Sequence, residues 1–322
     1  MSHYYYNGCY RMNIVKTAII IPVYNEEKNL INLFESIVNQ DLNRNIVISN
    51  IIVVDNGSID NSVLIASKYC TEVFILPGAT IAELRNYGAA HCCGEILIFM
   101  DADCRLASDV VSNVAELLSD KTIAAIGPDG LIPPDRSTWV QQTWYLHTRM
   151  LSDEQQNIEV ENLSSGFFAI TAQYFNEVGG FNGELSIGED TDISRKLRSK
   201  GFKLIKTNRL CVYNSGHPAT IIKFLKREYW HGDSFRHLLI HKKIDLLTVY
   251  FIINFIVILI SLAAMLLFKS IQLLLIYVIA SGLVLMFKAI KKVPRIGLVS
   301  FKLFLLYFLY VNARSAALFK CK

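Results

Sequence analysis

Short apolar runs alternate with amphipathic segments over the first hundred residues of the chain. Four runs have the length and β-branched composition of buried strands: residues 17–23, 48–54, 72–76 and 95–100. The first intervening segment carries Leu30, Leu33, Phe34 and Ile37 at helical spacing. This alternation predicts an α/β fold, with a mostly parallel sheet flanked by helices.

The pattern is less regular after residue 100. Further strands are expected at residues 122–127, 165–171 and 209–213, and further helices at 173–178 and 190–201. A polar, acidic stretch at 153–161 lacks an apolar face and is predicted to be a loop.

Long apolar segments follow in the C-terminal quarter. Leu246 to Phe268 contains no charged residue and is long enough to cross a bilayer, which takes about 20 residues. Ile271 to Phe287 is also uncharged but shorter. A third segment, 296–319, carries Lys302 and Arg314, and it either spans the membrane or lies in the interface.

These patterns divide the chain into four parts: an N-terminal arm at 1–15, an α/β domain at 16–220, an amphipathic juxtamembrane segment at 221–245, and a membrane region of two to three helices at 246–322. Most cations beside the first two apolar segments fall on one side, while the turn between these segments carries only Lys269. The positive-inside tendency therefore predicts an integral membrane protein whose α/β domain is cytoplasmic.

Composition indicates the cellular compartment and the kinds of binding partner. The seven cysteines are odd in number and show no paired metal spacing, which fits reduced thiols in the cytoplasm. The net charge of +4 lies partly beside the apolar segments and favours contact with membrane lipids. We find no aromatic-plus-basic pattern of the kind that binds nucleic acid.

Polar clusters follow three of the predicted strands, at 22–26, 55–58 and 101–103. In a parallel sheet the carboxyl ends of the strands border one crevice, where ligands bind. Asp101 and Asp103 stand two residues apart, so in an extended segment both carboxylates point to one side. Such a pair suits a divalent metal that carries phosphate oxygens, although a turn or helix cap gives the same pattern.

The order of five motifs resembles the family-2 glycosyltransferases over about residues 16 to 217. These motifs are Pro22-Val23-Tyr24-Asn25-Glu26, Val54-Asp55-Asn56-Gly57-Ser58, Arg85-Asn86-x-Gly88-Ala89, Asp101-Ala102-Asp103 and Gly188-Glu189-Asp190-Thr191-Asp192. The resemblance implies a GT-A fold and an inverting hexosyltransferase. It also implies a nucleotide-diphosphate sugar donor, commonly linked to UDP, and Mg²⁺ or Mn²⁺.

The resemblance assigns a role to each matching residue. Asp190 would be the catalytic base, and Asp103, with Asp101 and His217, would bind the metal. The implied donor-binding residues are Pro22, Tyr24, Glu26, Asp55, Arg85 and Asp101, and the implied acceptor-binding residues are Gly166, Glu189 and Trp230. Simpler roles stay open: helix capping for Glu26 and Asp190, a surface salt bridge for Arg85, a capping or core position for His217, and helix packing for Trp230.

The chain departs from the pattern of the processive polysaccharide synthases of this family. Their Gln-x-x-Arg-Trp motif is absent, although Trp230 stands in the corresponding region. We therefore expect transfer of one or a few sugars to a lipid-linked or glycan acceptor, in envelope polysaccharide or glycolipid synthesis. The alternatives are a processive synthase, a non-catalytic nucleotide-sugar-binding scaffold, and a sugar-1-phosphate nucleotidyltransferase. The last is disfavoured, because its Gly-rich, Arg-containing first loop is missing.

Overall fold

The computed structural model describes residues 14–151, 155–185, 187–232, 246–268, 271–293 and 297–318. Most of the predicted arm and residues 233–245 of the juxtamembrane segment lie outside these ranges. The chain forms two compact units, which we call the sheet unit (1–128, 153–184 and 189–212) and the helical unit (129–152, 185–188 and 213–322). This division differs from the predicted bounds, because residues 129–152 cluster with the C-terminal part of the chain.

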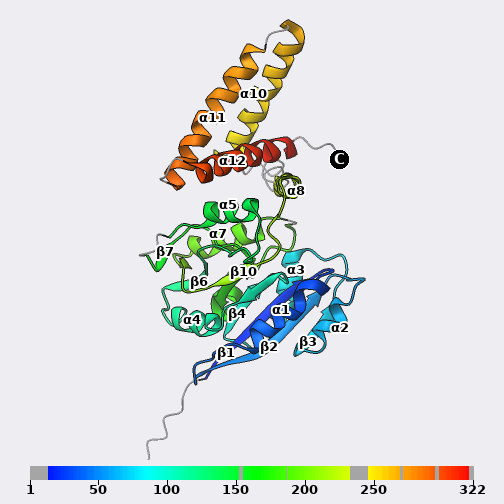
Figure 1. Ribbon diagram of the computed structural model, residues 1–322. Helices are drawn as coiled ribbons and strands as arrows, with labels where there is room; N and C mark the ends of the chain where they lie inside the picture. The colour runs from blue at the N-terminus through cyan, green and yellow to red at the C-terminus, as the bar shows by residue number, and fades with distance from the viewer. Residues whose placement is uncertain are drawn as a thin grey trace, which may run out of the picture. The chain divides into compact units, whose positions relative to one another are not determined.

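The sheet unit is built on eight strands in the order β3-β2-β1-β4-β8-β6-β9-β7 (Figure 1). Their bounds are β1 Val15–Val23, β2 Ile46–Asp55, β3 Glu72–Ile75, β4 Ile96–Met100, β6 Ile123–Pro128, β7 Asn157–Glu159, β8 Phe167–Thr171 and β9 Lys203–Thr207. Strand β1 pairs in parallel with β2 and β4, and β2 pairs in parallel with β3. Strand β8 runs antiparallel to both β4 and β6. The sheet is therefore mixed and mostly parallel, as predicted.

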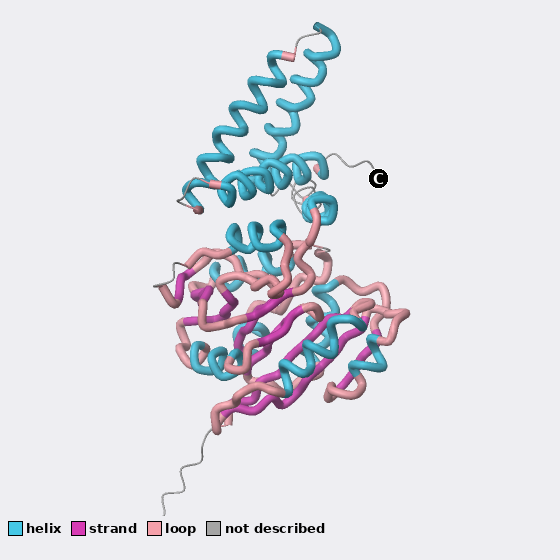
Figure 2. The backbone as a smooth tube through the Cα atoms, in the orientation of Figure 1, coloured by secondary structure: helices cyan, strands magenta, loops and turns pink. Residues whose placement is uncertain are grey.

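Helices lie on both sides of this sheet (Figure 2). They are α1 Glu27–Val38, α2 Ser62–Ala66, α3 Ile81–Ala90, α4 Val110–Leu117, α6 Ala172–Glu177 and α7 Glu189–Ser199. Two short strands, β5 Cys104–Leu106 and β10 Val212–Asn214, pair with each other in a second sheet. Residues 17–23 of β1 are all buried, as expected for a central strand that is covered on both faces.

The contact between α3 and the sheet depends on a glycine. A Cβ atom on Gly88 would lie 2.5 Å from Ile20 Cγ2 and 3.3 Å from Val54 Cγ2. Ile20 and Val54 are fully buried, so neither side chain has room to move aside. Gly88 therefore lets α3 approach β1 and β2 closely.

Several sequence predictions need correction. Residues 157–159, predicted to be loop, form β7, because their backbone pairs antiparallel with β9 and needs no apolar face to do so. The strand expected at 209–213 is the shorter β10 at Val212–Asn214. Elements β5, α4 and β9 were not predicted.

The run Asp60-Asn61-Ser62 is typical of a helix start, and Asp60 Oδ1 accepts from Ser62 N, the first residue of α2, at 3.0 Å. The same loop also serves the start of α1. Ser62 Oγ accepts from Glu26 N at 2.8 Å, and Asp60 Oδ2 accepts from Glu27 N at 3.2 Å. The N–H groups at the start of α1 need acceptors, and the loop before α2 supplies them.

The helical unit contains α5 Trp139–Thr148, α8 Ile221–His231, α10 Leu246–Phe268, α11 Gln272–Lys292 and α12 Leu298–Ala317. Among the described residues, Val249–Leu267 and Gln272–Lys292 are long and apolar enough to cross a bilayer. Helix α12 is not in this group. It contacts α5, α8, α10 and α11, and its Leu303, Leu306 and Tyr307 are buried in a shared apolar core.

A buried carboxylate connects α8 with α12. Glu228 is buried, and its Oε2 accepts from Arg314 at 2.8 Å while its Oε1 accepts from Arg227 at 3.0 Å. The guanidinium of Arg314 also lies over the ring of Tyr310, 4.3 Å from its centroid. Protein groups thus contact the third apolar segment on several sides.

We predict that Gly88→Ala destabilises the sheet unit. The added methyl group gains about 1 kcal/mol of helix propensity but overpacks the core, at a cost of about 1–3 kcal/mol. Urea unfolding of the full chain in detergent, followed by circular dichroism, should show a lower midpoint. Ala90→Ser on the exposed side of α3 is the control and should leave the midpoint unchanged. An unchanged midpoint for Gly88→Ala would show that α3 does not pack this closely.

Candidate active site at the switch point of the sheet

Strand register brings the three polar clusters to one edge of the sheet. Val23 pairs with Asp55, and Ile20 pairs with Phe99, which places Asp101 level with Pro22. The chain builds outward from β1 to β2 and β3 and then returns to the other side of β1 as β4. Open α/β sheets bind ligands at this kind of switch point, beyond the carboxyl ends of the strands.

The strand that follows on the other side of β4 adds a further segment to this edge. Met100 pairs with Phe167 of β8, and the next pair along brings Gly166 beside Asp101. Asp101 N donates to Gly166 O at 3.1 Å, and Cys104 Sγ donates to the same carbonyl at 3.3 Å. Gly166, predicted near the acceptor, therefore lies directly against the carboxylate motif.

Asp55 organises the loop after β2. Its side chain is buried, and its Oδ1 accepts from Gly57 N at 2.8 Å and from Ser58 N at 2.7 Å. Ser58 Oγ donates to Asp55 Oδ2 and accepts from Asn25 N at 2.8 Å. The carboxylate predicted to bind the base is therefore hydrogen-bonded within its own loop. To bind a base, Asp55 would have to exchange the hydrogen bond from Ser58 for one from the base.

The loop after β1 presents a different surface. Asn25 adopts a left-handed backbone with φ of 55°, and its Oδ1 accepts from Ile59 N at 2.9 Å. Tyr24 beside it is 57% exposed, which leaves its ring available to stack on a planar group. Glu26 accepts from Asn29 Nδ2 at 2.6 Å and makes no side-chain bond to the backbone N–H groups of α1, so the capping alternative does not describe it.

Arg85 occupies the centre of the site. Its side chain is 1% exposed, so the surface salt bridge considered from the sequence is excluded. Nη1 donates to Glu189 Oε1 at 2.7 Å, and Nη2 donates to Asp101 Oδ1 at 2.8 Å and to Ser165 O at 3.2 Å. The guanidinium thus joins the metal motif after β4, the start of β8 and the first turn of α7.

Asp190 lies in the first turn of α7, beside Glu189. Its Oδ1 accepts from Thr191 N at 2.7 Å, and its Oδ2 accepts from Ser165 N at 3.4 Å. Burial raises the pKa of Asp190 to about 6, and the like charge of Glu189 adds to this rise, while the Thr191 hydrogen bond and the Arg85 charge oppose it. A carboxylate with a pKa close to neutrality is suited to accept a proton.

Asp101 and Asp103, proposed from the sequence as metal ligands, follow the same strand of the sheet unit. His217, the third proposed ligand, belongs to the helical unit, and its Nε2 lies 3.0 Å from Leu131 O. Burial lowers the pKa of His217. The described residues contain no cluster of three or more His, Cys, Asp or Glu side chains around one point. Two carboxylates nevertheless fit Mg²⁺ or Mn²⁺, because such ions keep waters and bind substrate phosphates.

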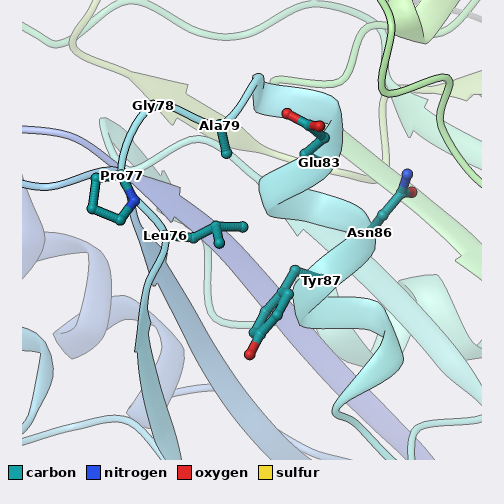
Figure 3. Close-up of a pocket in the computed structure, with 7 residues that line it drawn as sticks. All are labelled: Leu76, Pro77, Gly78, Ala79, Glu83, Asn86 and Tyr87. Carbon is teal, nitrogen blue, oxygen red and sulfur yellow. The ribbon is translucent and has the colours of Figure 1, made fainter.

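Trp230, predicted to bind the acceptor, belongs to α8 of the helical unit and is 54% exposed. A pocket of about 540 Å³ opens beside α3 and is lined by residues 76–79, Glu83, Asn86 and Tyr87 (Figure 3). Glu83 and Tyr87 stand two positions from Arg85, about 200° around the helix, so this pocket borders the opposite face of α3.

Sequence reasoning overlooked Ser165. Its hydroxyl donates to Glu189 Oε1 at 2.8 Å, its carbonyl accepts from Arg85, and its N–H faces Asp190. The signal available was a hydroxyl residue directly before Gly166 at the start of a buried strand. Serine at a strand end is common, so that signal did not single it out.

Comparison with known families decides the class. The family model described as glycosyl transferase family 2 matches residues 18–179, half of the chain, which includes Asp55, Arg85, Asp101 and Asp103. The chain belongs to glycosyl transferase family 2. The match agrees with the family that its motifs predict.

The curated relatives are distant, and each matches the chain over only part of its length. The O-antigen chain rhamnosyltransferase of Salmonella typhimurium is 26% identical over 202 residues, covering 59% of this chain and 63% of that protein. The chondroitin synthase of Pasteurella multocida is 24% identical, covering 61% of this chain and 20% of that protein. The dolichol-phosphate mannosyltransferase of Pyrococcus furiosus is 34% identical over 122 residues, covering 35% of this chain and 33% of that protein. The chain thus spans less than two thirds of the length of each.

Solved structures confirm the predicted GT-A fold. GalNAc-T7 with UDP, GalNAc and Mn²⁺ superposes with a TM-score of 0.52 at 20% identity, covering 65% of this chain and 44% of that one. The mannosyltransferase PcManGT of Pyrobaculum calidifontis with GDP-Man and Mn²⁺ superposes with a TM-score of 0.51 at 18% identity, covering 69% and 64%. At these identities the likeness is one of fold.

Because folding raises the pKa of Asp190 above its ordinary value of 3.8, we predict a pH-dependent gain in stability for Asp190→Asn. The carboxyl group favours folding fully below pH 3.8, and this contribution is lost as pH rises through about 6. Asparagine carries no charge to desolvate and keeps an acceptor oxygen, so Asp190→Asn should gain about 1–2 kcal/mol at pH 8 and little at pH 4. Melting temperatures at both pH values measure this, and equal differences at the two would contradict the raised pKa.

Proposed function

We propose that this protein is a membrane-anchored, inverting glycosyltransferase of the hexosyltransferase type. It transfers a sugar from a nucleotide-diphosphate donor to a lipid-linked or membrane-proximal acceptor. The observation that carries this proposal is the Arg85 bridge, which holds a strand-end carboxylate, Asp101, and the Glu189-Asp190 pair at one edge of the sheet. Sugar transfer needs a carboxylate at the metal and the donor diphosphate, and a second carboxylate that takes the acceptor proton, and the two must lie close together.

The donor half lies at the ends of β1, β2 and β4. Tyr24 offers an exposed ring to the base, and the loop held by Asp55 borders the nucleoside. UDP in one structural neighbour and GDP-Man in another support a nucleotide donor. For this chain we propose a UDP-linked sugar. Mn²⁺ in both neighbours supports Mg²⁺ or Mn²⁺ beside Asp101 and Asp103, where the ion would neutralise the departing diphosphate.

Asp190 performs the proton transfer in the acceptor half. The acceptor oxygen bonds to the anomeric carbon, the bond from that carbon to the diphosphate oxygen breaks, and the hydroxyl proton passes to Asp190. The attack comes from the side opposite the leaving group, so the anomeric configuration inverts. With a pKa of about 6, Asp190 is mostly ionised at pH 7 and ready to accept the proton.

The membrane part follows from exposed apolar surface. Helices α10 and α11 expose large apolar side chains along their length, including Ile260, Leu266, Ile276 and Phe287. Lipid is the medium that accepts such a surface. Lys288, Lys291 and Lys292 end α11, so the positive-inside tendency places the residues before α10 and after α11 in the cytoplasm, and α12 then lies at the interface.

We predict that Asp190→Asn abolishes transfer, with a loss of at least about 10³-fold in kcat, while donor binding stays within about threefold. The variant lacks a base, keeps the acceptor for Thr191 N and loses only the longer hydrogen bond from Ser165 N. Radiolabelled sugar transfer measures kcat, and calorimetry with the nucleotide sugar and MnCl₂ measures binding. Surviving turnover with the true acceptor would assign the base elsewhere.

We predict that Asp103→Ala weakens donor binding only where metal contributes to it. Binding of the nucleotide sugar should fall about 10-fold or more with MnCl₂ and stay unchanged in EDTA. Asp109→Ala removes an exposed carboxylate at the N-cap of α4, which makes no side-chain cap bond. It is the matched control and should leave both affinities as they are. If Asp103→Ala binds the donor with full metal dependence, Asp103 is not a ligand.

A further inference from the structure

The guanidinium of Arg85 connects parts of the chain that are far apart in sequence. It reaches Asp101, 16 positions away, at 2.8 Å and Glu189, 104 positions away, at 2.7 Å. Its remaining contacts are the carbonyl of Ser165 and the ring of Phe181, whose centroid lies 5.6 Å from Cζ. Both terminal nitrogens are thus committed to protein oxygens.

This commitment makes Arg85 an unsuitable direct contact for the donor diphosphate. The side chain is 1% exposed, so a phosphate oxygen could reach its terminal nitrogens only by displacing the carboxylates that now bind them. Leaving would expose a buried charge without a partner, which proteins avoid strongly. The geometry favours a fixed guanidinium over one that exchanges ligands during turnover.

Glu189 is equally fixed. It is buried, and its Oε1 accepts both from Arg85 Nη1 at 2.7 Å and from Ser165 Oγ at 2.8 Å. Asp190 follows it directly in the first turn of α7. Holding Glu189 therefore holds the backbone that carries Asp190, and the Ser165 N–H facing Asp190 Oδ2 continues the same network.

We propose that Arg85 and Glu189 are positioning residues, which form a buried ion bridge that sets the catalytic base relative to the carboxylate at the donor edge. Neither residue touches the reacting atoms in this role. The inference rests on the proposed function, since it assigns Asp190 the part of the base. It gives Arg85 and Glu189 roles different from donor contact and acceptor contact.

The test is donor hydrolysis by the full chain in detergent with MnCl₂. The probe is the nucleotide sugar, from a panel of UDP- and GDP-sugars, that the wild type cleaves. Glu189→Gln keeps the volume of the side chain but loses its charge, and we expect kcat to fall about 100-fold because a loosened base is misplaced. The donor KM should change less than about threefold.

The pH profile separates positioning from a general loss of structure. The charged groups that face Asp190 are Glu189 on its own helix and Arg85 on α3. Glu189→Gln removes a like charge, so the pH midpoint of the acid limb of the kcat profile should fall by about half to one pH unit. Arg85→Met removes an opposite charge, so the same midpoint should rise by a similar amount. A smaller folded fraction lowers kcat and leaves this midpoint where it was.

Controls keep the result interpretable. Arg209 and Glu116 form a two-bond ion pair in the same unit, with Nη2 to Oε2 at 2.7 Å, away from the network. Glu116→Gln should keep the wild-type kcat and midpoint. If Arg85→Met does not fold, Arg85→Lys keeps the charge but not the forked geometry and should lower kcat about 100-fold with little change in midpoint.

The outcomes are distinct. If the wild type cleaves a donor and Glu189→Gln cleaves it equally well, the positioning role alone is overturned. A Glu189→Gln defect confined to donor KM, or a lower kcat with an unmoved midpoint, overturns it as well. A wild-type chain that cleaves no nucleotide sugar in the panel overturns the proposed function and this role with it.

Discussion

The site depends on a buried guanidinium, whose positive charge must be balanced by neighbouring carboxylates. Arg85 is placed under the edge of the sheet by α3, and α3 can approach the sheet because Gly88 has no side chain. Once Arg85 is buried, Asp101 and Glu189 must stay with it, since an unpaired charge there is costly. The carboxylate after β4 and the first turn of α7 are therefore held together, although they are distant in sequence.

Strand order decides where that constraint acts. The chain leaves β1 in one direction and returns to its other side as β4, which opens a switch point next to Pro22 and Asp101. Antiparallel β8 then brings Ser165 and Gly166 to the same edge. The loops proposed to face the nucleotide and the helix α7, which carries the proposed base, thus come from different parts of the chain. Burial at this edge raises the pKa of Asp190 to about 6, and the like charge of Glu189 adds to the rise.

Local pattern predicted the elements whose signal lies within a few residues. The apolar runs of β1, β2 and β4, the helical spacing of Leu30 to Ile37, and the strand-end carboxylates were all readable. The strand β7 was not, because its pairing with β9 depends on residues about 45 positions away and leaves no local apolar pattern. Ser165 and the Arg85–Glu189 contact were hidden for the same reason. The surface alternative for Arg85 failed because burial of a charged side chain is set by its partners.

The central claim is that the carboxyl edge of β1, β2 and β4 binds a nucleotide-diphosphate sugar with a divalent metal. Equilibrium binding of a panel of nucleotide sugars to the purified chain, with MnCl₂ and with EDTA, tests it most directly. We expect at least one donor to bind more tightly with MnCl₂, and Asp55→Ala to weaken that binding about 10-fold or more by loosening the loop at the nucleoside. Metal-independent binding across the whole panel, or full affinity in Asp55→Ala, would contradict the account.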